Sequence, residues 1–416
     1  MLSKRQSQGP RSDKLALDHK WPTLLLLSLA ELLAMGTWFS ASAVVPALSA
    51  AWNLDDAGRA WLTMSVQVGF VVGALGSALL NLADRISARK LFAISAGLAA
   101  IATALIAGLV NDQATALGLR FLTGLFLAGV YPVGMKIMAT WTKADRGLGI
   151  GMLVGALTLG SAAPHLLNAL IGVNDWRLLL WVAAGLAALG GLIAAVFVRE
   201  GPYQTPSPRF NWRYAGEIFR VRELRLTNLG YLGHMWELYA MWGWIAAFFL
   251  DRFSGVGIAA TWASLGAFAV IAAGGLGSVL AGKWADQFGR TTITIASLVV
   301  SGACSLLTGF LFRGSPGLLL AVCLVWGFAI VADSAQYSAA ISELCQKEYV
   351  GTALTLQTSL GFLLTLVTIR LVPLIAERFG WSWAFAFLSI GPVIGIWAMF
   401  ALRRSPQSLR LAGGKR

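Results

Sequence analysis

The stretch KLFAISAGLAAIATALIAGLV (residues 90–110) holds one charged residue, Lys90, followed only by uncharged and mostly apolar ones. An α-helix needs roughly 20 such residues to cross the hydrocarbon core of a bilayer. This stretch therefore predicts a helix that spans a membrane.

Eleven further apolar runs of similar length surround this stretch. The twelve expected spans are 22–48, 58–82, 90–110, 114–139, 147–171, 177–198, 226–250, 259–283, 291–312, 316–341, 350–375 and 381–402. The chain is 57% hydrophobic and 12% charged, whereas a soluble domain carries roughly 25% charged residues. The first run resembles a signal peptide at Ala41-Ser42-Ala43 but is too long for one, so we interpret it as an uncleaved helix. The expected fold class is all-α, a polytopic membrane protein.

The net charge of +13 follows the loops of this topology rather than one basic face. When alternate loops are assigned to the two sides, 25 of the 32 Lys and Arg residues fall on the side of the N-terminus and five on the other. Cytoplasmic loops carry such an excess of positive charge. We expect both termini in the cytoplasm, a bacterial inner membrane as the location, the lipid bilayer as a partner and no nucleic acid.

The polar stretch 199–225, with three prolines, divides the twelve spans into two sets of six. The expected divisions are an N-terminal tail (1–20), an N-terminal six-helix bundle (21–198), a linker (199–225), a C-terminal six-helix bundle (226–404) and a C-terminal tail (405–416). Both tails are polar, and we expect them to be disordered.

Two internal matches relate the halves. ELLAMGTW (residues 31–38) in the first span matches ELYAMWGW (residues 237–244) in the seventh at Glu, Leu, Ala, Met and Trp. Ala83-Asp84 after the second span matches Ala285-Asp286 at the end of the eighth. Matches in corresponding helices are typical of parallel transporter repeats. The sequence thus predicts two pseudo-symmetric six-helix bundles.

The segment GKWADQFGR (residues 282–290) resembles the loop motif of the major facilitator superfamily. Its first-half copy keeps Asp84, Arg85, Arg89 and Lys90 but lacks the usual glycines. RFLTG (residues 120–124) resembles that superfamily's fourth-helix motif. The resemblance implies a twelve-helix transporter that works by alternating access.

The resemblance also implies a cytoplasmic gate. An acid at the end of one helix can accept from the free N–H groups that open a neighbouring helix. The residues assigned to the gate are Asp84, Arg85, Arg89, Gly282, Asp286, Gly289 and Arg290. The alternative is a static clamp. Gly147, Gly151 and Gly155 in the fifth span, with Gly69 and Gly73 in the second, form small-residue seams on which helices slide or simply pack.

Two glutamates are the leading candidates for a substrate or proton site. Glu31 lies nine residues beyond Pro22, about 14 Å along a helix and so near mid-membrane. Glu237 is its repeat mate. Trp38 and Trp244 share the helix faces of the two glutamates, and His234 lies one turn from Glu237. Burial favours the neutral form of a carboxyl, as a proton-coupling site requires. The alternative is a structural glutamate bonded to a neighbouring helix.

Further polar residues fall within spans, where charges are costly and usually face a partner or a cavity. Arg120 is a candidate to pair with a carboxylate or bind an anion, and Asp333 with Gln336 and Tyr337 is a candidate in the tenth span. Packing or surface roles compete for the weaker candidates, which are Lys136, His165, Gln357 and Arg370.

The leading functional hypothesis is a secondary transporter, proton-coupled, for a small solute. The carboxylate pair suits a cation or zwitterion, and Arg120, Lys136 and Arg370 suit an organic anion instead. A membrane sensor or scaffold that kept the fold is the alternative. No catalytic motif, phosphate loop or metal cluster is recognisable in the sequence, so we expect no enzyme, no cofactor and no metal. We expect a monomer.

Overall fold

The computed structural model describes residues 19–416 apart from 143–144, 173–174, 204–209, 212–213 and 347. The N-terminal tail expected over residues 1–20 therefore lies almost wholly outside the described residues, as does part of the linker expected over 199–225. The described residues form helices and no strand, as the apolar runs predict.

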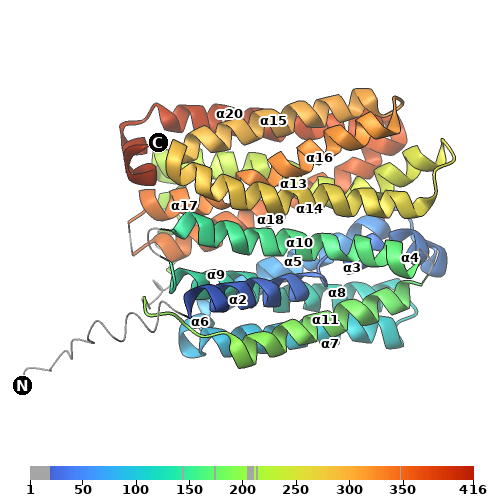
Figure 1. Cartoon of the computed structure of the whole chain (residues 1–416), viewed down its shortest axis with the longest axis horizontal. Coiled ribbons are helices and arrows are strands. Elements are labelled where there is room, and N and C mark those ends of the chain that lie inside the picture. Colours follow the sequence, from blue (N-terminus) through green and yellow to red (C-terminus); the bar gives the residue numbers. More distant parts are fainter. Residues whose placement is uncertain (1–18, 143–144, 173–174, 204–209, 212–213, 347) are drawn as a thin grey trace, which may run out of the picture.

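The first half contributes the helices coloured blue to green in Figure 1. They are α2 (Lys20–Met35), α3 (Ser40–Ala43), α4 (Val45–Trp52), α5 (Asp56–Leu79), α6 (Leu82–Arg85), α7 (Ala88–Leu109), α8 (Gln113–Leu127), α9 (Tyr131–Ala139), α10 (Arg146–Ile171) and α11 (Trp176–Phe197).

The second half, coloured yellow to red, lies beside the first, and the axes of its long helices are roughly aligned with those of the first half (Figure 1). Its elements are α12 (Glu217–Arg220), α13 (Arg222–Ser254), α14 (Ala260–Phe288), α15 (Arg290–Leu311), α16 (Pro316–Ala332), α17 (Ser334–Leu344), α18 (Val350–Phe379), α19 (Trp381–Ala386), η2 (Phe387–Ser389), α20 (Ile390–Arg403) and η3 (Pro406–Gly414). We call the end where α2 begins and Arg416 lies the tail end, and the opposite one the far end.

Four of the twelve expected spans are divided rather than continuous. The first divides after α2, the fourth between α8 and α9, the tenth at Asp333, and the twelfth at η2. Pro132 at the start of α9 has no N–H to donate to the preceding turn, which accounts for the break in the fourth. The breaks in the fourth and tenth spans occupy corresponding places in the two halves.

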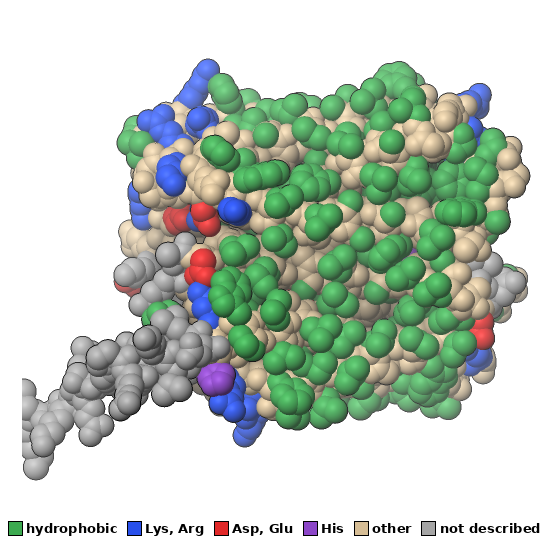
Figure 2. Space-filling view, viewed as in Figure 1, with side chains coloured by type: hydrophobic (Ala, Val, Ile, Leu, Met, Phe, Trp, Pro, Cys, Tyr) green, Lys and Arg blue, Asp and Glu red, His purple; other side chains and the backbone are tan. Residues whose placement is uncertain are grey.

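The surface supports a membrane position for this bundle. Hydrophobic side chains cover the middle of the molecule, and Lys, Arg, Asp and Glu gather at its two ends (Figure 2). Ten helices among the described residues are long and apolar enough to cross a bilayer unaided. The two remaining spans are the first and the seventh. The first begins with α2, which is short, and the seventh is α13, which is more polar. These two carry Glu31 and Glu237.

The halves meet along two helix pairs, α10 with α14 and α5 with α18. Small residues set the first contact. A β-carbon at Gly282 would lie 2.6 Å from the carbonyl oxygen of Gly147, and one at Gly151 would lie 2.7 Å from that of Ser278. Gly69 and Gly73 instead seat α8 of their own half against α5. Of the two predicted glycine seams, the one in the fifth span joins the two halves, and the one in the second span lies within the first half.

The C-terminal segment 405–416 is ordered, contrary to our expectation of a disordered tail. Leu411 is fully buried, and Ser408 donates to the Arg403 carbonyl at 3.1 Å. The Ala412 N–H donates to Glu343 at 3.0 Å, and Lys415 donates to the Asp286 carbonyl at 2.8 Å. A polar composition predicted disorder, but one apolar side chain and several main-chain bonds hold the segment against α17 and the end of α14.

Candidate functional site

A cavity of about 310 Å³ lies between the two halves. It reaches from the tail end, lined there by Asn81 and Gly351, to the middle of the molecule, lined there by Trp242 and Phe362. Its walls come from α5, α9 and α10 of the first half and α13, α17 and α18 of the second. Its position between the halves suits a central binding site for a solute.

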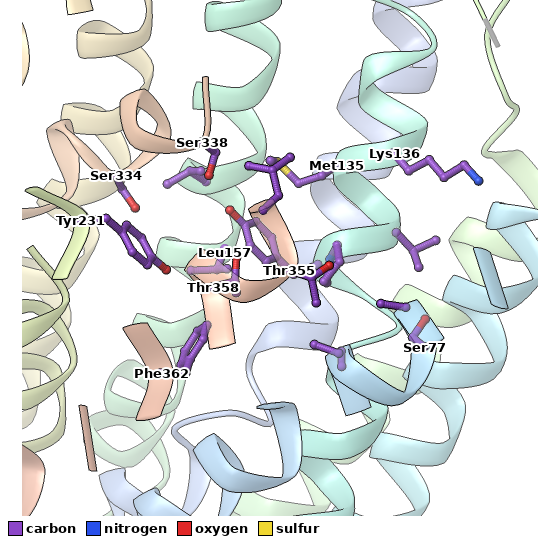
Figure 3. Close-up of a pocket in the computed structure, with 18 of the residues that line it drawn as sticks. Ser77, Met135, Lys136, Leu157, Tyr231, Ser334, Ser338, Thr355, Thr358 and Phe362 are labelled. Atoms are coloured by element: carbon purple, nitrogen blue, oxygen red, sulfur yellow. The ribbon is translucent and has the colours of Figure 1, made fainter. Parts of the chain in front are cut away.

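The cavity wall is aromatic and rich in hydroxyl groups (Figure 3). The aromatic residues are Tyr131, Phe210, Tyr231, Tyr239, Trp242 and Phe362. The hydroxyl residues are Ser77, Thr158, Ser334, Ser338, Thr355 and Thr358. Lys136 is the only charged residue among the described lining residues.

Six rings close the inner limit of this cavity, and we call them the aromatic layer. They are Trp38, Phe39 and Phe70 from the first half, and Tyr239, Trp242 and Phe362 from the second. Trp38 lies 4.9 Å from Phe70 and 5.4 Å from Phe362 between ring centroids. The layer thus joins both halves at the middle of the molecule.

A second cavity of about 240 Å³ lies on the far side of the aromatic layer. Gly243 and Trp244 line it, directly after Trp242, which lines the first cavity. Asn168 also lines it, and its Nδ2 donates to Ser264 of the other half at 2.9 Å. The two cavities therefore follow one another along the contact between the halves, with rings between them.

Glu31 is fully buried but does not line the first cavity. Neither of its carboxylate oxygens has a hydrogen-bond partner among the described residues. Its Oε2 faces Gly134 of α9, where a β-carbon would lie only 2.7 Å away. Val133 and Met135, on either side of Gly134, line the cavity, so the carboxyl group lies close to the cavity wall without lining it.

Glu237 lies at the corresponding place in the second half but is fully bonded. Its Oε1 accepts from Trp326 Nε1 at 2.6 Å and its Oε2 accepts from Ser301 at 3.0 Å. These donors come from α16 and α15 of the same half. Glu237 therefore tethers α13 within its own bundle in this conformation.

His234, Asp333 and Tyr337 form a buried chain next to the cavity wall. His234 Nδ1 lies 2.9 Å from Asp333 Oδ1, and the Tyr337 hydroxyl donates to Asp333 Oδ2 at 2.7 Å. Tyr231 and Ser334 flank this chain in sequence and line the cavity. The chain thus brings together three predicted site residues from α13, α17 and the turn between α16 and α17.

Arg120 is placed away from the cavity and bonds to backbone and hydroxyl oxygens. Its guanidinium donates to the carbonyls of Thr37, Trp38 and Leu62, the first at 2.7 Å and the last at 3.2 Å. A helix C-terminus carries partial negative charge, which favours a cation at the end of α2. Arg120 thereby holds the break after α2 that places Trp38 in the aromatic layer. It does not pair with a carboxylate among the described residues, as the sequence had suggested.

A comparison with family models gives a match over residues 27–271 and 253–416, to the model described as Major Facilitator Superfamily. The chain belongs to the major facilitator superfamily. As a member, it is an integral membrane protein, and the family that its motifs suggested is confirmed.

Curated relatives within the superfamily match part of the chain. The 4-hydroxybenzoate transporter PcaK of Pseudomonas putida is 29% identical over 184 residues, 44% of this chain and 40% of that protein. The puromycin resistance protein pur8 of Streptomyces alboniger is 28% identical over 191 residues, 44% of this chain and 36% of that protein. The chain thus aligns with less than half the length of these relatives.

Solved superfamily structures match nearly the whole chain. A bacterial homologue of the human lysosomal transporter Spinster, in an inward-facing and unoccupied conformation, has a TM-score of 0.70 at 15% identity and covers 93% of this chain and 97% of that one. The proton:xylose symporter XylE has a TM-score of 0.70 at 16% identity, covering 92% and 96%. These likenesses show the twelve-helix, two-bundle fold.

The superfamily's loop motif lies at the tail end, and its second-half copy faces the first half. Both carboxylate oxygens of Asp286 lie so close to Gly147, near the start of α10, that a β-carbon there would collide with them. Arg290 lies 3.5 Å from Asp286 and forms a two-point contact with Glu343 at 2.8 and 2.5 Å. Gln336 also accepts from Arg290, at 3.0 Å.

Two glycines of the motif are explained by close approach. Gly282 faces Gly147, as described above. Gly289 has a φ of +96°, a backbone conformation that favours glycine, and its missing side chain leaves room for the carbonyl oxygens of Lys415 and Arg416.

The first-half copy of the motif makes a different contact. Asp84 pairs with Lys136 of its own half, and Lys136 also donates to the Ala83 carbonyl at 2.5 Å. Arg85 is exposed and Arg89 half-buried at the same end. The first cavity lies between this pair and α18. The second-half copy of the motif therefore lies where the halves are in close contact, and the first-half copy lies where the cavity separates them.

Sequence reasoning missed most of the residues that line the first cavity. Among them are Tyr131, Tyr231, Tyr239, Trp242 and Phe362. A face of aromatic residues on α13 was a possible signal, because Tyr231 and Tyr239 recur at helical spacing from His234 and Trp242. Such residues are abundant in membrane helices, and only the packing separates those that line a cavity. Trp244 lies in the second cavity and donates to the Ile369 carbonyl at 2.9 Å.

Proposed function

We propose that the protein is a secondary transporter that carries a small solute by alternating access, driven by protons. The observation that carries this proposal is the succession of two cavities between the halves, separated by the aromatic layer. Rocking of one bundle against the other would open the second cavity and close the first. We propose residues 21–198 and 226–404 as the two moving units.

Gly147, Gly151, Gly282 and Asp286 form the seam that must open at the tail end in this cycle. The seam is held by close backbone approach and by the Asp286 carboxylate at the start of α10. The proposal assigns Asp286, Arg290 and their motif partners to the gate. Asp84, Arg85 and Arg89 would take the equivalent position against α18 when the first cavity closes.

Proton coupling is proposed to use Glu31 and Glu237, with His234, Asp333 and Tyr337 as a second proton-holding group. An ionised carboxylate without a partner is costly inside a membrane. A proton on Glu31 removes that cost. Movement of α2 against α9 would change the surroundings of Glu31 and so the cost of its ionised form. Glu237 would exchange its bonds to Trp326 and Ser301 for a proton in the other conformation.

The proposed location is a bacterial inner membrane with both termini in the cytoplasm, and the protein is proposed to act as a monomer. The placement of Lys and Arg supports this orientation. Cys304, Cys323 and Cys345 are all buried, so an added surface cysteine can be labelled selectively. A membrane-impermeant maleimide should label Arg313→Cys in intact cells and Arg404→Cys only after permeabilisation; the reverse pattern would invert the topology.

The relatives suggest where to begin with solutes. One is named for 4-hydroxybenzoate and another for puromycin resistance, and we propose that this chain carries an organic solute that fits the same kind of aromatic cavity.

The test is transport in proteoliposomes with an imposed pH gradient. In wild-type proteoliposomes the pH gradient should drive solute transport, by symport or by exchange of the solute for protons. In Glu31→Gln, the rate of solute transport should no longer depend on the pH gradient. Glu223→Gln is the matched control, because Glu223 is also buried but accepts from Ser405 at the tail end. If Glu31→Gln and Glu237→Gln both couple normally, the two glutamates are structural; if no solute moves, the transport proposal fails.

A further inference from the structure

The described residues of the first cavity offer no free charge to a bound solute. Lys136 is its one charged lining residue within the described part of the chain. The Lys136 ammonium is bonded to the Asp84 carboxylate and the Ala83 carbonyl. In Figure 3 its side chain runs away from Tyr231 and Phe362. The pair is neutral as a whole and points out of the cavity.

Three of the four charged groups behind the wall are also engaged by other residues. Glu237 accepts from Trp326 and Ser301, and Asp333 accepts from Tyr337 and lies 2.9 Å from His234 Nδ1. Arg120 is held by main-chain carbonyls. Glu31 has no hydrogen-bond partner among the described residues, but it faces Gly134 of α9 and does not line the cavity. A charged solute would lose its hydration in this cavity without gaining an opposite charge, which is unfavourable.

The wall does provide ring faces and hydroxyl groups. Tyr231, Tyr239 and Phe362 present aromatic surface, and aromatic rings stack favourably on one another in offset or edge-on arrangements. Ser334, Ser338 and Thr358 lie near Tyr231 and can donate to or accept from a polar substituent (Figure 3). The volume of about 310 Å³ is at the lower end of the roughly 300–1,000 Å³ of ligand pockets.

We propose that the solute binds as an uncharged aromatic molecule, of one ring or two fused rings, with a small hydrogen-bonding substituent. The proposal rests on the proposed function, because it assigns the first cavity to the transported solute. An aromatic acid would bind in its protonated form. The proton that drives transport would be carried separately, by the buried carboxyl groups.

The test compares three probes with the same ring: 4-hydroxybenzamide (neutral), 4-hydroxybenzoate (anion) and tyramine (cation). Equilibrium binding to the purified full-length protein is measured by calorimetry at pH 7, without any gradient. We expect the amide to bind at least about tenfold more tightly than either ion, equivalent to about 1.4 kcal/mol. Binding of 4-hydroxybenzoate should strengthen as the pH falls toward about 4, where a carboxylic acid gains its proton, relative to the amide at each pH.

Two variants locate the binding. Phe362→Leu should weaken amide binding about two- to tenfold, the range of one aromatic pair, and Thr358→Val should weaken it without altering ring contacts. Phe310→Leu is the matched control, since Phe310 is 81% exposed on the outer surface. Size-exclusion profiles and thermal unfolding show whether each variant is folded.

Three results would overturn the inference: no amide binding at millimolar concentration, tighter binding of either ion, or a preference for 4-hydroxybenzoate that disappears in Lys136→Gln. These outcomes are separate from transport. If the amide binds in this cavity but no solute moves in proteoliposomes, the aromatic site stands and the transport proposal fails.

Discussion

Glu31 and Glu237 occupy equivalent positions in the two halves, yet their surroundings differ. Glu31 has no hydrogen-bond partner among the described residues, whereas Glu237 accepts from Trp326 and Ser301. The two glutamates are retained in the repeat, but the residues that surround them have diverged. Equivalent sequence places two carboxyl groups at equivalent depth, and the neighbouring helices decide whether each is bonded.

Other features of the halves remain alike. Gly124 of α8 lies against the Val66 carbonyl of α5, and Gly327 of α16 lies against the Val270 carbonyl of α14. Both are crossings of the second and fourth helices of a half, and backbones approach closely where small residues allow it. The halves therefore share their internal packing and differ in their polar contacts. Four changes test this distinction.

The largest loss of stability is expected at the shared crossings. A β-carbon in Gly124→Ala or Gly327→Ala would collide with backbone, which cannot move aside as a side chain can. Each should lower the free energy of unfolding by about 1–3 kcal/mol or more, measured by thermal unfolding in detergent. Gly76→Ala and Gly243→Ala are matched controls with open space around them. Unequal losses in the two halves would contradict shared packing.

The two glutamates should respond differently to the same substitution. Glu237→Leu removes both acceptor oxygens and leaves the Trp326 Nε1 donor without its acceptor, at a cost of about 1–3 kcal/mol. Glu31→Leu removes a carboxyl group that has no partner among the described residues and should leave stability unchanged or higher. Thermal unfolding at pH 7 measures both. Equal destabilisation would mean that Glu31 has gained partners in the membrane.

A substitution in the glycine seam between α10 and α14 should change the relative position of the two halves more than the free energy of unfolding. A β-carbon in Gly282→Ala would press on the Gly147 carbonyl and favour separation at the tail end. Unfolding free energy should change by less than about 1 kcal/mol. Ala47→Cys lies in the second cavity and should react more slowly with a soluble maleimide in the Gly282→Ala background, because separation at the tail end closes the far end. An unchanged or faster rate would argue against rocking about this seam.

The smallest effect concerns helix caps at the far end. In the first half Asp55, Asp112 and Asp175 cap α5, α8 and α11, whereas α14 and α16 begin without a side-chain cap. The Thr115 N–H stabilises the charged form of Asp112 and lowers its pKa from the ordinary value.

Because the folded pKa of Asp112 is the lower one, its contribution to stability is present above about pH 4, the unfolded value, and is lost as the pH falls through the folded pKa. Asp112→Asn should keep the cap and remove this pH dependence, whereas Asp112→Ala should lose both. Unfolding temperatures between pH 3 and 7 distinguish the two; identical profiles for Asn and wild type would show that the charge is immaterial.

The twelve spans, the two-half architecture and the family were predictable because they depend on local properties. Apolar runs long enough for a bilayer, the loop motif at residues 282–290 and the repeat at Glu31 and Glu237 are all visible along the chain. The divided helices and the ordered segment 405–416 were not, because they depend on contacts from elsewhere. Arg120, for example, holds the break after α2 from a helix more than eighty residues away.

The sequence by itself determined how often the chain crosses a membrane and which few polar residues must be buried in it, because burial of charge is too costly to be accidental. Only the tertiary structure decided what those residues touch. Within the described part of the chain it left Glu31 without a hydrogen-bond partner and bonded Glu237 and Asp333. It also assembled the cavity wall from aromatic and hydroxyl side chains of six helices. Such contacts join residues far apart in the chain, and the apolar pattern of a membrane helix does not say which face meets which neighbour.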